Sequence, residues 1–484
     1  MNVRGIFRVL SYVVGAEGIF LLLPAIVGFI YGETFGALVY LAVAVICLAA
    51  LVISRVFSRH HAAERRGFYV KEGFVTTALC WIVMSLIGAV PFVVTGDIPN
   101  YIDALFEVVS GFSTTGSSVL SDVEGLLHCN LFFRSFTHWI GGMGILVFVM
   151  AIMPMSGSAS LSLMKAESPG PSVSKLVPKI QTTALILYII YIVLTVLEFV
   201  LLLFDGEMPV FNAICHTFGT AGTGGFSVTN DSVAGYSDYV KIVTTVFMML
   251  FGLNFTFYYL LLMRKFRDAL GMEEVKWYLG IYFVASLAVI GSLAYNHISL
   301  SGNVLGTFFT CASLMTTTGY TIVNYNDWPV FTHIVFMMLM FIGGCAGSTG
   351  GGFKVSRIML LVKQIGKEVR QQIHPNRVYI VKVDKKPVPH EVIKSCNTLL
   401  ISYILIFAVS LLIVSWDGFD LTTTFVGVLA TYNNIGAGLG EVGVGGSFGI
   451  FSYTSKIVMI FDMLAGRLEI VPMLLLFHPT TWSK

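Results

Sequence analysis

Four short stretches of this sequence place hydroxyl-bearing or small residues around a glycine, each directly after an apolar segment. They read LFEVVSGFSTTGSS, FNAICHTFGTAGTG, FFTCASLMTTTGYT and FVGVLATYNNIGAG, and they end at Ser118, Gly224, Thr321 and Gly438. A glycine adopts positive φ without strain and can turn neighbouring carbonyl oxygens to one side of the chain. Rings of such oxygens replace the hydration shell of a monovalent cation. The stretches therefore predict a binding site for a weakly hydrated cation such as K⁺.

These stretches lack the side chains that divalent cations require. Asp and Glu are absent from 112–120, 218–230, 316–323 and 433–440, whereas Ca²⁺ and Mg²⁺ call for carboxylate ligands. The alternative for any single copy is a glycine that merely ends a helix. Four copies at matching positions favour the cation site over that alternative.

The surrounding chain has the composition of a polytopic membrane protein. Of its 484 residues, 56% are hydrophobic and only 12% are charged, whereas soluble domains carry about a quarter charged residues. A helix needs roughly 20 apolar residues to cross a bilayer. That length predicts ten spans, near 6–30, 35–57, 73–95, 130–153, 181–204, 238–263, 277–297, 330–365, 396–416 and 450–477.

The four stretches also define an internal repeat. Each has one predicted span before it and one after it, and their aligned glycines are Gly116, Gly222, Gly319 and Gly436. Irregular backbone is tolerated at membrane depth only where protein buries it or it lines a water-filled path. We therefore expect an all-α polytopic membrane protein with four pseudo-symmetric helix–pore-loop–helix (M1-P-M2) repeats around one central pore, after an extra N-terminal pair of transmembrane helices. The expected boundaries are 1–68 for the pair and 69–165, 166–271, 272–372 and 373–484 for the repeats.

The basic residues predict the orientation in the membrane. Most of the 29 Lys and Arg residues fall in segments that lie inside if the N-terminus is inside. Both termini are therefore expected to be cytoplasmic. The formal net charge of +2 gives no indication of nucleic acid as a partner.

The eighth predicted span is too long for one simple helix and contains a glycine-rich segment. Its sequence GGCAGSTGGG holds six glycines, and each costs roughly 1 kcal/mol against alanine in a helix interior. The segment predicts a break at membrane depth that acts as an intramembrane gating loop below the filter. The alternative is that the glycines only permit close helix packing. The proposed gate residues are Gly343, Gly344, Cys345, Ala346, Gly347, Ser348, Thr349, Gly350, Gly351 and Gly352.

Arg467 is a charged residue within the last predicted span. It lies roughly 22 Å along the helix from Ser452 at about 1.5 Å per residue, so it is expected to face the pore as a positive barrier below the filter. The alternative is a buried structural ion pair. Asp462 and Glu469 are near in sequence but not at the spacings that face one another on a helix.

The motifs STTGSS, GTAGTGG, TTTGYT, NNIGAGLG and GGCAGSTGGGFK, together with the fourfold plan, resemble the Trk/Ktr/HKT superfamily of potassium transporters over nearly the whole chain. The extra N-terminal pair favours its TrkH branch. The fourth repeat departs from the pattern, because Asn434 and Ile435 stand where the others have hydroxyls. The resemblance implies a K⁺ selectivity filter at Thr114, Thr115, Gly116, Ser117, Thr220, Ala221, Gly222, Thr223, Thr317, Thr318, Gly319, Tyr320, Asn434, Ile435, Gly436 and Ala437.

The resemblance also implies a function and partners. It implies K⁺ uptake across the bacterial cytoplasmic (inner) membrane by a homodimer, regulated by a cytosolic nucleotide-binding ring of TrkA type. The ten Lys and Arg residues of 354–394 are one place where that ring could dock. No cofactor is expected on this chain, because its GxGxxG match at Gly438 follows a pore loop and not a strand.

Two other functions stay open. One is a K⁺ or Na⁺ symporter coupled to protons or sodium, and the other is a polytopic membrane enzyme. Alternating-access carriers typically carry inverted repeats, and enzymes need clustered reactive groups. Lone polar residues in apolar segments, such as Glu107 and His138, are more often hydrogen-bond partners between helices. The sequence therefore favours a channel-like pore and no enzymatic activity.

Overall fold

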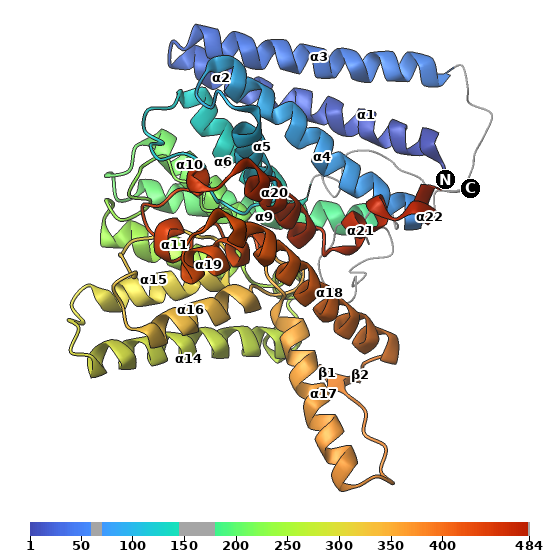
Figure 1. Ribbon diagram of the computed structural model, residues 1–484, viewed down its shortest axis with the longest axis vertical. Coiled ribbons are helices and arrows are strands. Elements are labelled where there is room, and N and C mark those ends of the chain that lie inside the picture. The colour runs from blue at the N-terminus through green and yellow to red at the C-terminus, as the bar shows by residue number, and fades with distance from the viewer. Residues whose placement is uncertain (60–69, 145–179, 483–484) are drawn as a thin grey trace.

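A computed structural model describes residues 1–59, 70–144 and 180–482, and this part of the chain is almost entirely helical. Figure 1 shows long helices lying alongside one another. The first three are α1 (Val3–Phe20), α2 (Leu22–Ile30) and α3 (Thr34–Arg59). They pack against one another, and α1 and α3 also contact α4 (Val70–Thr95). The N-terminal helices therefore form a layer on one side of the molecule.

Four later parts of the chain share one order of elements: a long helix, a short helix, an irregular loop and a second helix. They are α4, α5 (Tyr101–Phe112) and α6 (His128–Met143); α9 (Ile180–Leu203), α10 (Val210–Gly222) and α11 (Asp238–Phe251); α14 (Glu273–Tyr295), α15 (Asn303–Met315) and α16 (Val330–Ile342); and α18 (His390–Val414), α19 (Leu421–Tyr432) and α20 (Tyr453–Arg467). We call the irregular stretches loop 1 (113–127), loop 2 (223–237), loop 3 (316–329) and loop 4 (433–452).

The short helices are too short to cross a membrane. They have 12 or 13 residues each, which is roughly 18–20 Å at 1.5 Å per residue, whereas the hydrocarbon core is about 30 Å thick. Side chains cap two of their N-termini, since Asn100 accepts from the Ile102 amide at 2.8 Å and Asp420 from the Thr422 amide at 2.9 Å. Each short helix must therefore end inside the protein and not on its far side.

The helices that follow the loops close these four units into a ring. The second helix of each unit packs against the short helix of the next: α6 against α10, α11 against α15, α16 against α19, and α20 against α5. The last contact joins the fourth unit to the first. The C-terminal ends of all four short helices therefore converge inside this ring.

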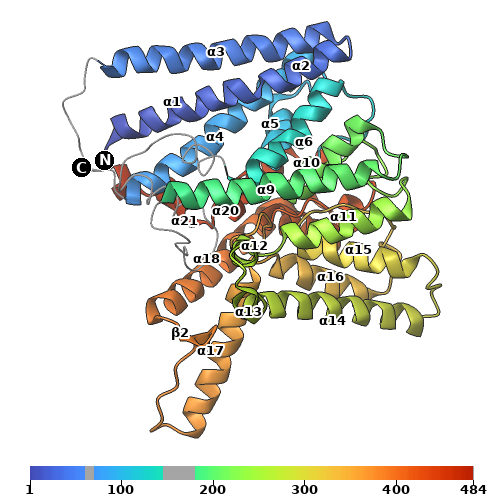
Figure 2. The same cartoon turned by 180° about the vertical axis from the view of Figure 1, so that it is seen from behind.

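Several smaller elements complete the described chain. They are α12 (Phe255–Leu262), α13 (Phe266–Gly271), α17 (Val355–Ile373), strands β1 (Lys382–Val383) and β2 (Lys386–Pro387), three short 3₁₀ turns, α21 (Val471–Phe477) and α22 (Pro479–Trp482). The two strands pair antiparallel. Helix α17 and this strand pair project from the rest of the molecule (Figures 1 and 2). The Lys71 ammonium also donates to the Thr480 carbonyl at 3.0 Å.

The described residues include six helices long and apolar enough to cross a membrane, or seven if a bent pair counts as one span. These six correspond to six of the ten predicted spans, and α11 with α12 forms the bent pair, at 89°. That bend differs from the single span expected over 238–263, and Figure 2 shows α12 nearly end-on. The span expected over 450–477 also breaks, after Arg467. The second half of the 130–153 span and the boundaries near 68 and 165 lie outside the described residues.

One contact joins the N-terminal helices to α6 and makes stability depend on pH. Between α2 and α3, the Glu33 carboxylate accepts from the His128 amide at 2.7 Å and the Cys129 amide at 3.0 Å. Partial burial opposes ionisation, but these hydrogen bonds hold the pKa of Glu33 below its ordinary value of 4.5. A lowered folded-state pKa contributes stability that is complete above the unfolded pKa and is lost as pH falls through the folded value.

We therefore expect the apparent Tm of the detergent-solubilised protein to fall below about pH 4.5 more steeply than that of Glu33→Gln. Glutamine keeps an acceptor but does not titrate, so the variant should begin less stable at neutral pH and lose less on acidification. Intrinsic fluorescence melts from pH 7 to pH 3.5 measure both quantities. Identical acid dependence in the two proteins would contradict a stabilising role for the ionised carboxylate.

Candidate ion-binding site

The four loops share one backbone conformation just after their short helices. In each loop two residues separated by one have positive φ, with values between 54° and 84°. In all four loops the second of these residues is a glycine. The pairs are Thr114 and Gly116, Thr223 and Gly225, Thr317 and Gly319, and Asn434 and Gly436.

This pattern corrects the alignment of the second repeat. Gly222 was aligned with Gly116, but it lies in the last turn of α10, and Gly225 has the matching φ of 77°. The hydrogen bonds agree, because the Gly224 amide donates to the Gly219 carbonyl at 2.8 Å. That bond corresponds to the 2.8 Å bond from the Thr115 amide to the Ser110 carbonyl. The expected register was therefore wrong by three residues, and Thr220 and Ala221 lie inside α10.

The glycines of the four loops close a ring. A Cβ on Gly116 would overlap the Gly224 carbonyl oxygen, one on Gly225 the Thr318 oxygen, one on Gly319 the Ile435 oxygen, and one on Gly436 the Thr115 oxygen. Each loop thus touches the next, and the fourth touches the first. Real Cβ atoms do not approach backbone this closely, so the contacts require glycine at all four positions.

The chemistry at the ring is that of neutral oxygens. The carbonyls of Thr115, Gly224, Thr318 and Ile435 occupy equivalent places, and the C-terminal ends of four helices, which carry partial negative charge, lie next to them. No group of three or more His, Cys, Asp or Glu side chains suited to a metal ion occurs among the described residues. Such a ring can hold a monovalent cation without carboxylate ligands.

The glycine-rich segment predicted to break the eighth span does so. Helix α16 ends at Ile342 and α17 begins at Val355. The intervening 343–354 loop is buried for most of its length. It contacts the ring directly, because the Gly351 amide donates to the Thr317 hydroxyl at 2.6 Å and the Gly352 amide to the Asn433 carbonyl at 2.9 Å. The loop therefore lies against loops 3 and 4.

The bend between α11 and α12 holds the other side of the 343–354 loop. Because α11 ends at Phe251, the Gly252 carbonyl is free to accept from the Cys345 amide, at 3.0 Å. The Phe255 amide, at the start of α12, donates to the Gly347 carbonyl at 3.0 Å. From α14, the Glu274 carboxylate accepts from the Ala346 amide at 2.6 Å. The bend between α11 and α12 thus forms backbone hydrogen bonds with the loop that separates α16 from α17.

Arg467 joins the ring to the 343–354 loop. Its guanidinium donates to the Thr114 hydroxyl at 3.2 Å, the Thr349 carbonyl at 2.8 Å and the Gly142 carbonyl at 2.7 Å. A positive charge therefore lies between Thr114 of loop 1 and Thr349 of the 343–354 loop. Glu469 pairs with Arg357 at 2.6 Å, and Asp462 accepts from Ser410 at 2.8 Å.

Sequence reasoning missed two groups of residues at this site. Gly224 and Gly225 were passed over because Gly222 and Gly225 in GTAGTGG each follow a threonine by two residues. Only the hydrogen bonds at the end of α10 identify Gly225 as the glycine that matches Gly116. Lys354 and Arg357 belong to the basic 354–394 segment where a cytosolic partner could dock, but they are 3% and 5% exposed. The Lys354 ammonium donates to the Gly350 carbonyl, so it supports the 343–354 loop instead.

Comparisons with known proteins find full-length relatives. The family model TrkH, described as a cation transport protein, matches residues 41–484. The chain is 36% identical over 494 residues to the Trk system potassium uptake protein TrkH of Salmonella typhimurium, with all of both chains covered. It is 35% identical to the Trk system potassium uptake protein TrkG of Escherichia coli over 86% of each chain. The crystal structure of the potassium transporter TrkH from Vibrio parahaemolyticus superposes with a TM-score of 0.84 and 32% identity, again over all of both chains.

Proposed function

This chain belongs to the TrkH family of cation transport proteins and is a potassium uptake transporter of that type, not an enzyme, and we propose that K⁺ passes through the ring formed by its four loops. The observation that carries this proposal is the closure of the ring, in which each loop glycine meets the next loop's carbonyl oxygen. A closed ring of oxygens surrounds a path, whereas four unconnected helix ends would not. The proposed pathway is thus the axis of four M1-P-M2 repeats.

The proposed selectivity filter keeps three of the expected segments and shifts the fourth. It comprises Thr114–Ser117, Thr317–Tyr320 and Asn434–Ala437, and, in the second repeat, Thr223–Phe226 in place of Thr220–Thr223. The shared positive φ at Gly116, Gly225, Gly319 and Gly436 supports this set. K⁺ is the transported ion and is not a resident cofactor.

The 343–354 loop is the proposed gate. It is held by backbone hydrogen bonds from α11, α12 and the ring, and by the side chains of Glu274, Lys354 and Arg467. Several weak contacts on a glycine-rich segment allow a second arrangement at modest cost. Movement of the loop away from Thr317 and Asn433 would open the path below the ring.

The remaining proposals concern setting and partners. They are a bacterial inner membrane, both termini in the cytoplasm, a homodimer, and a regulatory nucleotide-binding ring of TrkA type. A common side for the two ends is supported by contacts at the start of α4, where Glu72 accepts from the Asn2 amide at 3.2 Å and Lys71 donates to the Thr480 carbonyl at 3.0 Å. Exposed cations on and beyond α17 support docking of a cytosolic partner there. These exposed cations are Arg370, Arg377, Lys382, Lys385, Lys386 and Lys394.

Purified protein in liposomes tests the proposed function. Current carried by K⁺ is measured across the liposome membrane with and without an imposed proton gradient. The proposal expects current that reverses near the K⁺ equilibrium potential, is much smaller with Na⁺ alone, and does not change with the proton gradient. Transport that requires the proton gradient, or a Na⁺ gradient, would favour the coupled symporter instead.

Replacing Arg467 by alanine is expected to raise K⁺ conductance several-fold. A unit charge about 4 Å from an ion contributes on the order of 1 kcal/mol even at the dielectric constant of water, and here that charge opposes a cation. Arg467→Lys retains the charge and should conduct like the parent. Single-channel recording of both variants provides the comparison, and equal conductance in the parent and Arg467→Ala would contradict the barrier role.

A further inference from the structure

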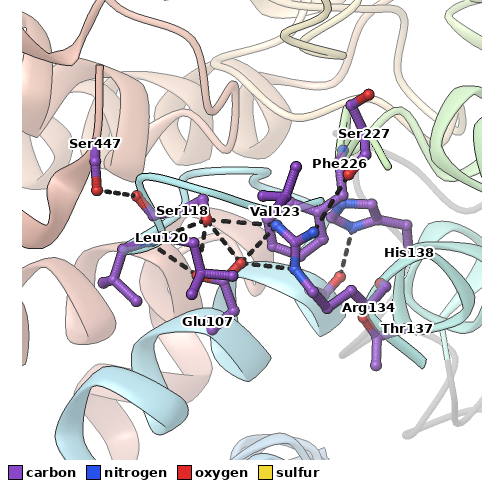
Figure 3. Close-up of polar contacts among 12 residues, drawn as sticks. Glu107, Ser118, Leu120, Val123, Arg134, Thr137, His138, Phe226, Ser227 and Ser447 are labelled. Atoms are coloured by element: carbon purple, nitrogen blue, oxygen red, sulfur yellow. Dashed lines mark hydrogen bonds and ion pairs between the residues drawn. The ribbon is translucent and has the colours of Figure 1, made fainter. Parts of the chain in front are cut away.

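A buried cluster of charged and polar side chains contacts both loop 1 and loop 2 (Figure 3). Glu107 comes from α5, and Arg134 and His138 come from α6. The Arg134 guanidinium forms an ion pair with the Glu107 carboxylate at 2.7 Å, and the two side chains are 2% and 0% exposed. The Arg134 Nε atom also donates to Glu107 at 2.9 Å.

The carboxylate end of this cluster holds loop 1. Glu107 accepts hydrogen bonds from the Ser118 hydroxyl and from the Val119 amide, both at 2.9 Å. Ser118 follows the proposed filter residue Ser117 directly. The position of the loop 1 backbone therefore depends on the Glu107 carboxylate.

The other end of the cluster holds loop 2. Arg134 donates to the Ser227 carbonyl at 3.3 Å, and its guanidinium lies 4.1 Å from the centre of the Phe226 ring. The Phe226 amide donates to Nε2 of His138 at 3.2 Å, while Nδ1 lies 2.8 Å from the Gly111 carbonyl. Because an amide only donates and a carbonyl only accepts, these contacts fit a neutral imidazole with its hydrogen on Nδ1. Arg134 and His138, one helical turn apart, thus both contact loop 2.

Stability alone is a poor explanation for a buried pair of this kind. Removing two charges from water is costly, and apolar residues of similar volume often stabilise a fold as well or better. Neutral groups bridge other neighbouring loops, since Tyr320 donates to the Phe226 carbonyl at 3.3 Å and Asn434 to the Thr115 hydroxyl at 2.9 Å. The planar, multidentate guanidinium of Arg134 offers what those groups lack, which is several fixed directions at once.

We propose that Glu107 and Arg134 are positioning residues that fix the separation of loops 1 and 2 and thereby set the K⁺ over Na⁺ selectivity of the ring. The inference rests on the proposed function of the ring. Because Gly116 in loop 1 contacts Gly224 in loop 2, a shift of either loop moves the carbonyl oxygens that would surround the ion. Neither charged side chain needs to touch the ion for this effect.

The test compares Glu107→Gln and Arg134→Gln with a matched control, Asp103→Asn. Asp103 lies one turn before Glu107 on α5 and pairs with Lys456 at 2.7 Å, so its replacement also removes an ion pair of α5. Each protein is assayed for its K⁺/Na⁺ permeability ratio in liposomes. In detergent, the difference between the Tm shifts produced by K⁺ and by Na⁺ reports ion binding without flux.

Both glutamine variants are expected to lose about tenfold in the permeability ratio, because each leaves a buried charged group without its partner. Their K⁺-specific Tm shift should also shrink, while Asp103→Asn keeps both at the parental value. If the pair acted only through its charge on the ion, the two variants would change K⁺ binding in opposite directions. That result, or parental ratios in both variants, would overturn the positioning role.

Two further outcomes keep the inference separate from the proposed function. A parent protein without K⁺ preference would overturn the proposed function itself, whereas a selective parent with selective variants overturns only this inference. If Glu107→Gln does not fold, Glu107→Asp retains the charge but shortens its reach to Ser118 and Val119. A partial loss of the ratio is expected in Glu107→Asp, and a parental ratio there would contradict the role.

Discussion

Replacing Gly116 by serine is expected to lower the K⁺/Na⁺ permeability ratio by about tenfold, or about 1.4 kcal/mol, because the new Cβ would displace a backbone carbonyl of the ring. Gly116 has φ of 81°, and a Cβ there would overlap the Gly224 carbonyl oxygen. That oxygen belongs to backbone and cannot turn aside as a flexible side chain would. The ring must widen at this contact, and a wider ring matches K⁺ less closely.

Gly96 provides a control for the backbone strain alone. It also has positive φ, 87°, but no atom lies within 4 Å of the position that its Cβ would take. Gly96→Ser should therefore carry a similar conformational cost and leave the permeability ratio unchanged. Reversal potentials measured with K⁺ on one side and Na⁺ on the other compare the two variants with the parent. A parental ratio in Gly116→Ser would show that the contact with Gly224 does not control selectivity.

Deleting Cys345–Gly350 is expected to raise K⁺ flux and to weaken its dependence on a cytosolic regulatory partner. The deletion removes the hydrogen bonds that tie the 343–354 loop to Gly252, Phe255, Glu274 and Arg467. Each such bond contributes about 0.5–1.5 kcal/mol, so losing several should shift the closed and open populations by more than tenfold. Gly351 and Gly352 remain and can keep their bonds to loops 3 and 4.

A milder change in the same loop guards against a deletion variant that misfolds. Glu274→Gln keeps the shape of the side chain but removes the charge that accepts from the Ala346 amide. It should raise flux less than the deletion does. Rb⁺ uptake into liposomes, with size-exclusion profiles to establish folding, measures both variants. Folded variants that transport no faster than the parent would count against a gating loop.

The short helices, their glycine loops and the break between α16 and α17 could be predicted because each has a local cause in the sequence. An apolar stretch too short to cross the membrane, followed by polar residues and glycine, has few alternatives. The run from Gly343 to Gly352 cannot continue a helix without large cost. The depth of Arg467 in an apolar span likewise predicts a role at the pore, which the Arg467→Ala variant tests.

Other features depend on contacts that no local pattern encodes. The register of loop 2 depends on the hydrogen bond from the Gly224 amide to the Gly219 carbonyl, which places Gly225 at the position of Gly116. The sequence alone does not distinguish Gly225 from Gly222, because each follows a threonine by two residues. The bend after Phe251 lies in a stretch whose hydropathy predicts one span, and bonds from the 343–354 loop compensate it. The break after Arg467 precedes Glu469 and Pro472, and the proline is a local signal for it that the predicted 450–477 span did not use. Likewise, the partner of Glu107 lies on another helix.

The central claim is that the carbonyl oxygens of the ring bind the transported cation, and anomalous diffraction from crystals grown with Rb⁺ in place of K⁺ tests it most directly. Rb⁺ resembles K⁺ in charge and hydration and scatters anomalously. The account predicts an anomalous peak enclosed by the carbonyl oxygens of Thr115, Gly224, Thr318 and Ile435. An empty ring in such crystals, or Rb⁺ bound only beside acidic side chains elsewhere, would contradict it.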